Sequence, residues 1–427
     1  MEAQYVAIFI FAAAYVLIIT EKIHRTIVAL GAAMVLLFAG ILSQEKAVGY
    51  IDFNTIGLLI GMMIMVNILS ETGLFHYLAI RAAQKVKARP IQLLLVFSSL
   101  TALCSAFLDN VTTVLLTVPV TFSITSRLQI SPKPFLVAQI LASNIGGTAT
   151  LIGDPPNIMI GSAVPELTFM VFLQNLAPIC LLIFVGTIVL LVLYYRRDLQ
   201  ADPALGRQIM ELDAKHEIHQ PLLLKKCLWV MGLTMCLFMG HSLLHMETAT
   251  AALGGASLLL LLTARRDDQL LAKIFSRIEW TAIFFFAGLF ILVGSLVETG
   301  VIRQMAEAMI LVTGGSCSAV AMMLLWFGAI GSAFIDNIPL VATLIPLIKE
   351  MGQLGLGNID GLWWALSLGA CLGGNGTLIG ASANVVVAGM AEQHGYKLSF
   401  WQYMKIAFPL MLFSVFLSML YIYFRYL

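Results

Sequence analysis

Residues 143–157 read SNIGGTATLIGDPPN, and residues 370–384 read ACLGGNGTLIGASAN. The two stretches share Gly-Gly, Thr-Leu-Ile-Gly and a final Asn at a constant offset of 227 residues. The same offset places SAFLDN at 105–110 on SAFIDN at 332–337. A constant offset over roughly a hundred residues indicates a duplicated unit.

The composition is typical of an integral membrane protein. Of 427 residues, 60% are apolar and 11% are charged, whereas about a quarter of a soluble domain is charged. A net charge of +1 favours neither a nucleic-acid partner nor an acidic tail. Six scattered cysteines indicate no disulfide framework. These figures exclude a soluble enzyme and predict membrane lipid as the surroundings.

Apolar runs long enough to cross a bilayer appear in a window of about 19 residues. We expect the first run to be a retained helix, because it lacks the features of a cleaved secretory signal. The window predicts ten helices, at 4–20, 26–43, 55–70, 135–163, 167–195, 227–244, 248–264, 281–297, 361–390 and 403–424.

Two further runs, 91–127 and 318–349, are each interrupted near the middle by an acidic residue. Asp109 and Asp336 stand at these interruptions, and each precedes an Asn. The halves are short, which suits a re-entrant hairpin that enters and leaves on one side. Two ordinary helices joined by a loop are the alternative.

Ten crossings and two hairpins place nearly all basic residues on one side. Of 24 Lys and Arg residues, only Lys46, Arg303, Lys349 and Arg425 fall on the other side. The positive-inside rule then predicts that both termini lie on the outer side of the cell membrane. The hydrophilic segment 196–226 becomes a cytoplasmic linker.

The linker separates a first copy, 1–195, from a second copy, 227–427. Each copy has an odd number of crossings, so the second must lie upside down relative to the first. Further upstream the offset is 223, which leaves four extra residues near Arg265 in the second copy. The predicted fold is an all-α polytopic membrane protein with two inverted repeats, about ten transmembrane helices, two re-entrant hairpins and interrupted helices at the midplane. Secondary transporters have this architecture; duplication without functional symmetry is the alternative.

Polar and helix-breaking residues gather in four segments at membrane depth. Unwound backbone is tolerated there only where protein or a wet cavity surrounds it, so we expect the segments to converge on a substrate or ion site. Opposed half-helix ends suit an oxygen-bearing guest and a cation. The candidate binding residues are Asp109, Asn110, Thr112, Thr113, Ser143, Asn144, Gly146, Gly147, Thr148, Thr150, Asp154, Asn157, Asp336, Asn337, Gly373, Gly374, Asn375, Gly376, Thr377, Ser382 and Asn384.

Three of these residues are acids: Asp109, Asp336 and Asp154. An ionised carboxylate is costly inside a bilayer, so each must have a role or a partner that offsets this cost. Proton or sodium coupling is one reason, because a buried carboxylate can exchange a cation with either side. The alternative for Asp109 and Asp336 is an N-cap of the second hairpin helix. Asp154 has no acidic counterpart, since Ala381 stands at its equivalent position; we favour a cap before Pro155 over coupling there.

The four segments contain no Lys or Arg. A site built from amides, hydroxyls and carboxylates suits a neutral hydroxylated acid or a bare cation better than a doubly charged anion.

At FLDNVTTVLLTVPV (107–120) and SNIGGTATLIGDPPN the sequence resembles the ion-transporter superfamily, in its arsenite-permease and sodium/proton-antiporter branch, and is similar to the pink-eyed-dilution (P) protein type. The resemblance implies a homodimer that moves substrate by an elevator mechanism. It also implies arsenite or antimonite export, sodium/proton exchange or anion transport. The Ser-Asn-Thr triplets of dicarboxylate relatives are intact neither at Ser143-Asn144 nor at Asn375-Gly376-Thr377.

Uncharged arsenite agrees with the missing basic residues and is the substrate that we favour, with no cofactor beyond a coupling proton or sodium ion. A separate ATPase subunit, a passive channel and an intramembrane aspartyl protease are alternatives. The sequence contains neither an H-E-x-x-H motif nor a P-loop. His241, His245 and Glu247 are spaced like metal ligands, but we expect them in an outer loop.

Overall fold

The structure is a computed structural model that describes residues 2–20, 22–241, 244–264 and 267–427. Arg265 and Arg266, counted above among the basic residues of the predicted cytoplasmic side, lie outside these ranges. Within them the chain forms helices, turns and loops and contains no strand. The all-α prediction is therefore confirmed.

The first copy contains ten described helices that end before the linker. They are α1 (Glu2–Thr20), α2 (Arg25–Phe38), α3 (Gln44–Tyr50), α4 (Phe53–Ser70), α5 (Leu74–Lys85), α6 (Pro90–Phe107), α7 (Asn110–Arg127), α8 (Lys133–Thr148), α9 (Pro155–Ala163) and α10 (Phe169–Tyr195). The linker adds α11 (Pro203–Met210) and a short 3-10 helix, η1 (Ala214–Glu217).

The second copy repeats this series in the same order. Its helices are α12 (Pro221–Gly240), α13 (Thr248–Thr263), α14 (Asp268–Ser276), α15 (Trp280–Glu298), α16 (Val301–Val312), α17 (Cys317–Phe334), α18 (Asn337–Gln353), α19 (Asp360–Gly373), α20 (Ser382–Gln393) and α21 (Phe400–Tyr426). Each helix from α1 to α10 thus has a counterpart from α12 to α21. The helix α12 begins six residues before 227, the predicted start of the second copy.

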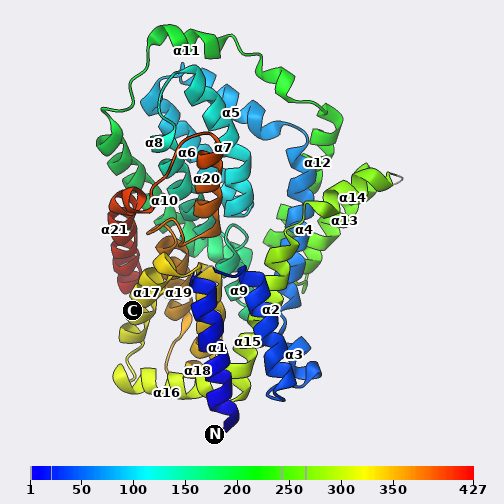
Figure 1. Cartoon of the computed structure of the whole chain (residues 1–427), viewed down its shortest axis with the longest axis vertical. Helices are drawn as coiled ribbons and strands as arrows, with labels where there is room; N and C mark the ends of the chain where they lie inside the picture. The colour runs from blue at the N-terminus through cyan, green and yellow to red at the C-terminus, as the bar shows by residue number, and fades with distance from the viewer. Residues whose placement is uncertain (1, 21, 242–243, 265–266) are drawn as a thin grey trace.

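Contacts between the copies are reciprocal. The helix α4 packs on α13, and its counterpart α15 packs on α2. Likewise α9 packs on α18, and α20 packs on α7. In Figure 1, α6 and α7 lie in the upper half, and α17 and α18 lie in the lower half. This is the contact pattern expected of the predicted inverted repeats; the inversion itself stays a prediction.

Eight described helices are long and apolar enough to cross a bilayer, and α6 and α17 are among them. The helices at the predicted crossings 26–43 and 248–264 are shorter, with 14 residues in α2 and 16 in α13. At 1.5 Å per residue they are about 21 and 24 Å long, less than the roughly 30 Å of a hydrocarbon core. The 19-residue window missed α3, α5, α14 and α16 because they have only 7 to 12 residues.

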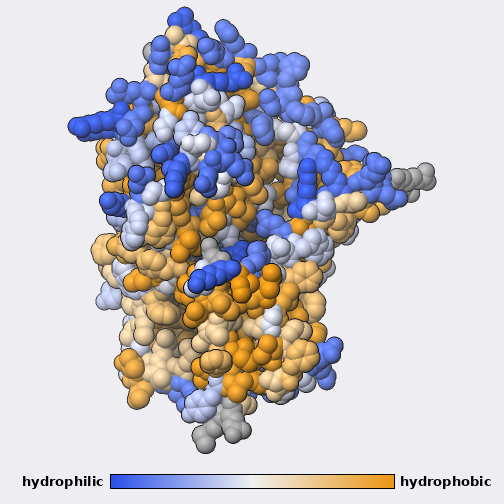
Figure 2. Space-filling model, in the orientation of Figure 1, coloured by the Kyte–Doolittle hydropathy of each residue, from blue (hydrophilic) through white to orange (hydrophobic). Residues whose placement is uncertain are grey.

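The surface agrees with a membrane location. Leu181, Leu182, Val185 and Leu193 on α10 are all more than half exposed. Figure 2 shows an apolar surface over the lower and middle parts of the molecule and a hydrophilic top, where Figure 1 places α11. Exposed apolar side chains on this scale suit contact with lipid tails.

Two equivalent carboxylates join the copies by ion pairs. Glu71, after α4, pairs with Lys273 of α14 at 3.0 Å and with Arg277. At the equivalent position, Glu298 of α15 pairs with Lys46 of α3. Partial burial would raise the pKa of Glu71, but hydrogen bonds from Lys273 and Arg277 outweigh it and hold the pKa below its usual value. The glutamate of each Glu-Thr-Gly motif thus forms ion pairs with the other copy. We call the ion pairs of Glu71 and Glu298 the clasp.

We expect Glu71→Gln to lower the stability of the folded protein at pH 7 by less than about 1 kcal/mol, because the ion pair is partly exposed. A lowered folded-state pKa stabilises the fold above the unfolded pKa, about 4.3, and this contribution is lost as the pH falls. Thermal unfolding in detergent at pH 7 and pH 4 measures it. The exposed Glu392→Gln is the control, and an equal gap between Glu71→Gln and wild type at both pH values would contradict the assignment.

Two glycines let the hairpins approach the interrupted helices closely. A Cβ on Gly146 of α8 would collide with the carbonyl oxygen of Ala102 in α6. At the equivalent positions, a Cβ on Gly373 of α19 would collide with the carbonyl oxygen of Ala329 in α17. The neighbour is backbone in both cases, so it cannot turn aside.

We expect Gly146→Ala to destabilise the protein by about 1–3 kcal/mol, since α6 and α8 would have to separate. Gly232→Ala is a matched control, because a Cβ at this helical glycine meets nothing within 4 Å. The control should leave thermal stability unchanged or raise it, since alanine is the better helix former. Equal melting temperatures for the two variants would refute the close-approach argument.

Candidate functional site

Acidic residues cap the second helix of each hairpin. The Asp109 carboxylate accepts the Thr112 N–H at 2.8 Å, and the Asp336 carboxylate accepts the Ile338 N–H at 3.2 Å. The N-cap alternative for both residues is confirmed. Coupling at either residue stays a prediction.

Side-chain amides satisfy the unwound backbone in both interrupted helices. Asn157 donates to the carbonyl oxygens of Thr148 at 3.0 Å and Thr150 at 2.8 Å. Asn384 donates in the same way to Gly374 at 2.7 Å and Thr377 at 2.9 Å. Because both side chains are buried, these bonds replace the helical bonds that each break removes.

Hydroxyl groups fasten each hairpin to the neighbouring interrupted helix. Ser105 donates to the Ser143 carbonyl oxygen at 2.7 Å, and Ser332 donates to that of Ala370 at 2.6 Å. Further along, the hydroxyls of Thr150 and Thr377 donate to the hairpin carbonyls of Ala106 and Ala333. All four bonds obey the 227-residue offset.

Asn144 joins three of the four predicted segments. Its amide nitrogen donates to Asn375 Oδ1 at 2.9 Å and to Asn384 Oδ1 at 3.0 Å. Its own Oδ1 accepts from Asn110 Nδ2, at the tip of the first hairpin, at 3.1 Å. All four side chains are buried. We call Asn110, Asn144, Asn375 and Asn384 the amide cluster.

Asp154 connects the first interrupted helix to the second hairpin. It occupies the N-cap position of α9, but its carboxylate accepts no N–H from that helix. It instead faces Asn337 Nδ2, at 3.3 Å. The predicted cap before Pro155 is therefore wrong, because the carboxylate finds a partner across the interface. Asp154 is only 1% exposed, and no basic group among the described residues lies within ion-pair distance.

A basic residue from outside the four segments enters the site. Arg25, the first residue of α2, forms an ion pair with Asp336 and donates to Ser382 Oγ at 3.1 Å. The four segments themselves contain no Lys or Arg, as the sequence shows, but Arg25 brings a basic group to Asp336 from the start of α2. Figure 1 shows the turn between α1 and α2 at mid-height. The repeat gave no indication of Arg25, because the equivalent position in the second copy holds Thr248 and not a basic residue.

The other predicted residues take supporting positions. Thr112 donates its hydroxyl to Asp109, and Thr148 donates to the Asn144 carbonyl oxygen at 2.6 Å. Thr113 is buried, and its hydroxyl has no hydrogen-bond partner among the described residues. Asp109 makes its side-chain bonds within its own hairpin, outside the amide cluster. All five predicted glycines are buried at or near the breaks: Gly146, Gly147, Gly373, Gly374 and Gly376.

Sequence reasoning missed three further contacts. Ser367 donates to Asn157 Oδ1 at 2.6 Å, and Cys371 Sγ lies 3.6 Å from the same atom. Tyr403 of α21 donates to the Asn375 carbonyl oxygen at 3.1 Å. Ser367 and Tyr403 lie well outside the glycine-rich motifs, so only the packing of α19 and α21 reveals them.

Two cavities occupy equivalent places in the copies. One, of about 370 Å³, is lined by His24, Arg25, Asp336 and Ser382 among others. The second, of about 290 Å³, includes Glu247 and Thr248, which correspond to His24 and Arg25 at the 223-residue offset. Each cavity lies where an interrupted helix meets a corner between two outer helices.

Buried polar side chains from the two copies thus meet at one place, around Asn144. The sequence profile described as citrate transporter matches residues 15–369. The chain belongs to the citrate transporter family. An uncharacterized transporter of Mycobacterium tuberculosis is 42% identical over 99% of this chain and 98% of its own length.

The human P protein is 35% identical over 98% of this chain, which spans 59% of that longer protein. The resemblance to the ion-transporter superfamily and the P protein type is therefore confirmed. Two solved structures share the fold. The YdaH transporter of Alcanivorax borkumensis has a TM-score of 0.59 at 12% identity over 99% of this chain and 98% of its own. MtrF of Neisseria gonorrhoeae, which is described within a class of antimetabolite efflux pumps, has a TM-score of 0.58 at 15% identity. The match covers 91% of this chain and 83% of MtrF.

We expect Asn144→Ala to lower thermal stability strongly. It would leave polar atoms of Asn110, Asn375 and Asn384 buried without their partner, and each unsatisfied group costs about 1–3 kcal/mol. Thermal unfolding in detergent measures the loss, with the exposed Gln353→Ala as control. A melting temperature for Asn144→Ala equal to that of the control would show that the amide cluster does not hold the site together.

Proposed function

We propose that this membrane transporter is an ion-coupled secondary carrier that exports a small oxygen-rich substrate by an elevator movement. The observation that supports it best is Asp154, a buried carboxylate without a basic partner at the junction of the first interrupted helix and the second hairpin. An ionised group at such a depth costs about 2.5–3.5 kcal/mol on insertion scales. Binding a proton or a sodium ion offsets this cost, so Asp154 is the proposed coupling residue.

The ion pair between Arg25 and Asp336 is the proposed latch of the second hairpin. Arg25 begins α2, which packs on α15, whereas Asp336 caps α18, which packs on α9. Movement of the hairpin relative to α2 would separate the two charges. The released Arg25 then presents a basic group to the 370 Å³ cavity that it lines.

The substrate class follows from the donors and acceptors. The amides and hydroxyls near Asn144 suit a compact molecule with several oxygen atoms. Arsenite or antimonite, uncharged near neutral pH, needs no basic partner and is the first candidate. Arg25 favours a second candidate, a carboxylate such as the citrate in the family description. Sodium/proton exchange is the case in which the coupling ion is itself the cargo.

Transport into proteoliposomes without ATP tests the proposal. We expect Asp154→Asn to reduce uphill transport driven by an imposed pH or sodium gradient by roughly tenfold or more, because the coupling charge is lost. The exposed Asp268→Asn should transport like wild type. Undiminished uphill transport by Asp154→Asn would refute the coupling role, and flux only down the substrate gradient in wild type would indicate a channel.

The same liposomes compare labelled arsenite, citrate and sodium. Asp109→Asn and Asp336→Asn should also abolish gradient-driven transport while leaving folded protein in detergent; full activity in both would limit coupling to Asp154.

The proposal includes a homodimer, which cross-linking in the liposomes tests. A need for added ATP would favour a separate ATPase subunit over ion coupling.

A further inference from the structure

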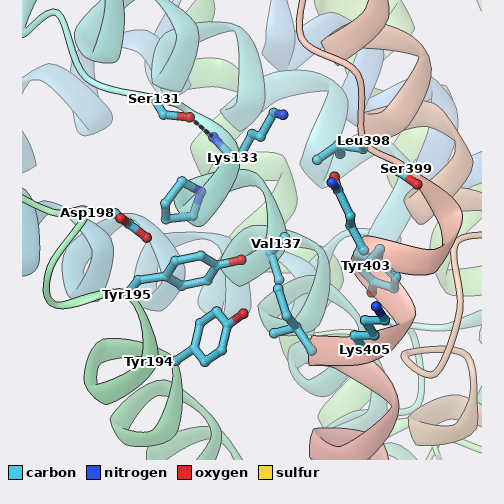
Figure 3. Close-up of a pocket in the computed structure, with 13 residues that line it drawn as sticks. Ser131, Lys133, Val137, Tyr194, Tyr195, Asp198, Leu398, Ser399, Tyr403 and Lys405 are labelled. Carbon is cyan, nitrogen blue, oxygen red and sulfur yellow. Dashed lines mark hydrogen bonds between the residues drawn. The ribbon is translucent and has the colours of Figure 1, made fainter.

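A cavity of about 600 Å³ lies away from the candidate site, between the start of α8, the end of α10 and the start of α21 (Figure 3). None of the residues that line it belongs to the four polar segments. The predicted topology places this corner on the cytoplasmic side, since it includes the boundary between α10 and the linker.

The cavity carries more positive than negative charge. Lys133 and Lys405 line opposite walls, and neither forms an ion pair with a described residue. Asp198 is the acidic residue in the lining, and it is exposed. The first turn of α21 also borders the cavity, and no side chain caps its free amide groups. Two ammonium groups and a helix N-terminus together attract an anion.

The hydroxyl of a largely buried tyrosine points into the same space. Tyr195 is 8% exposed, and its hydroxyl forms no hydrogen bond with a described residue. Figure 3 shows the hydroxyls of Tyr194 and Tyr195 directed from α10 toward the middle of the cavity. A hydroxyl that has no protein partner and opens into the cavity is free to bond water or a ligand. Together with the lysines, it completes a set of donors suited to the oxygen atoms of a phosphate.

The surroundings indicate a lipid rather than a soluble anion. Val137, Leu398 and Ile406 supply apolar wall beside the charged groups. Tyr194 and Trp401 are each 64% exposed next to it, as aromatic side chains are at the boundary between lipid and water. Basic pockets between transmembrane helices at this boundary bind anionic head groups. We propose that the cavity binds the phosphate of an anionic membrane phospholipid with one negative charge.

The floor of this lipid pocket reaches the amide cluster. Tyr403 lines the pocket, and its hydroxyl donates to the Asn375 carbonyl oxygen in the second break. A bound lipid therefore contacts a residue that also contacts the candidate site. Regulation of transport by the lipid would depend on the proposed function. Binding of the lipid to the pocket does not depend on it and can be tested separately.

Binding to full-length, delipidated protein in neutral detergent tests the pocket. Phosphatidylglycerol should raise the melting temperature and stay bound in native mass spectrometry, while phosphatidylcholine and inorganic phosphate should do neither. The double variant Lys133→Gln/Lys405→Gln should weaken phosphatidylglycerol binding by about fivefold for each lysine, the equivalent of about 1 kcal/mol per basic residue near a membrane. Tyr195→Phe should weaken it severalfold without removing a charge.

Lys397→Gln is the matched control, because Lys397 is an exposed lysine close in sequence to α21 but outside the lining. It should bind phosphatidylglycerol like wild type. Equal binding by the double variant and wild type would overturn the site, as would equal binding of phosphatidylcholine and phosphatidylglycerol. Full stabilisation by inorganic phosphate would overturn the lipid assignment in favour of a soluble anion.

Discussion

The constraint on which the structure depends is that every polar group of unwound backbone inside a bilayer must find a partner in the protein or in a wet cavity. Asn144 meets this constraint at the centre, where it bonds Asn110, Asn375 and Asn384 at once. One side chain thereby links a hairpin tip to both interrupted helices. Around it, Asn157 and Asn384 satisfy the carbonyl groups that each break exposes. The polar site is consequently a supported part of the fold rather than a gap within it.

Duplication explains the scaffold, and departures from duplication locate the chemistry. Hydroxyl bonds, glycine crossings and the clasp at Glu71 and Glu298 all occur twice at equivalent positions. Asp154 faces the second hairpin, and its counterpart is Ala381; Arg25 binds Asp336, and its counterpart is Thr248. An acid and a base that exist in one copy only therefore gather at one hairpin, and this asymmetry gives the proposed carrier its coupling residue and its latch.

The repeat and the breaks were predictable because their cause is local. Glycines at 146–147 and 373–374 weaken a helix wherever they stand, and Asp109 and Asp336 begin a helix by capping it. Helices as short as α3 and α14 escaped because they give no long apolar run. The cap predicted for Asp154 was wrong, and Arg25 was overlooked, for a different reason. Their partners lie far away in sequence, and only the tertiary arrangement shows them.

The exchange of partners between copies also affects how the protein is made. When the first copy has left the ribosome, α2 and α4 have inserted, but their packing partners α15 and α13 have not been translated. At that stage Lys46 also lacks its ion-pair partner, because Glu298 has not been translated. The nascent first copy therefore cannot mature as a finished unit, and its apolar faces must remain in lipid, or be held by the insertion machinery, until synthesis has passed α15.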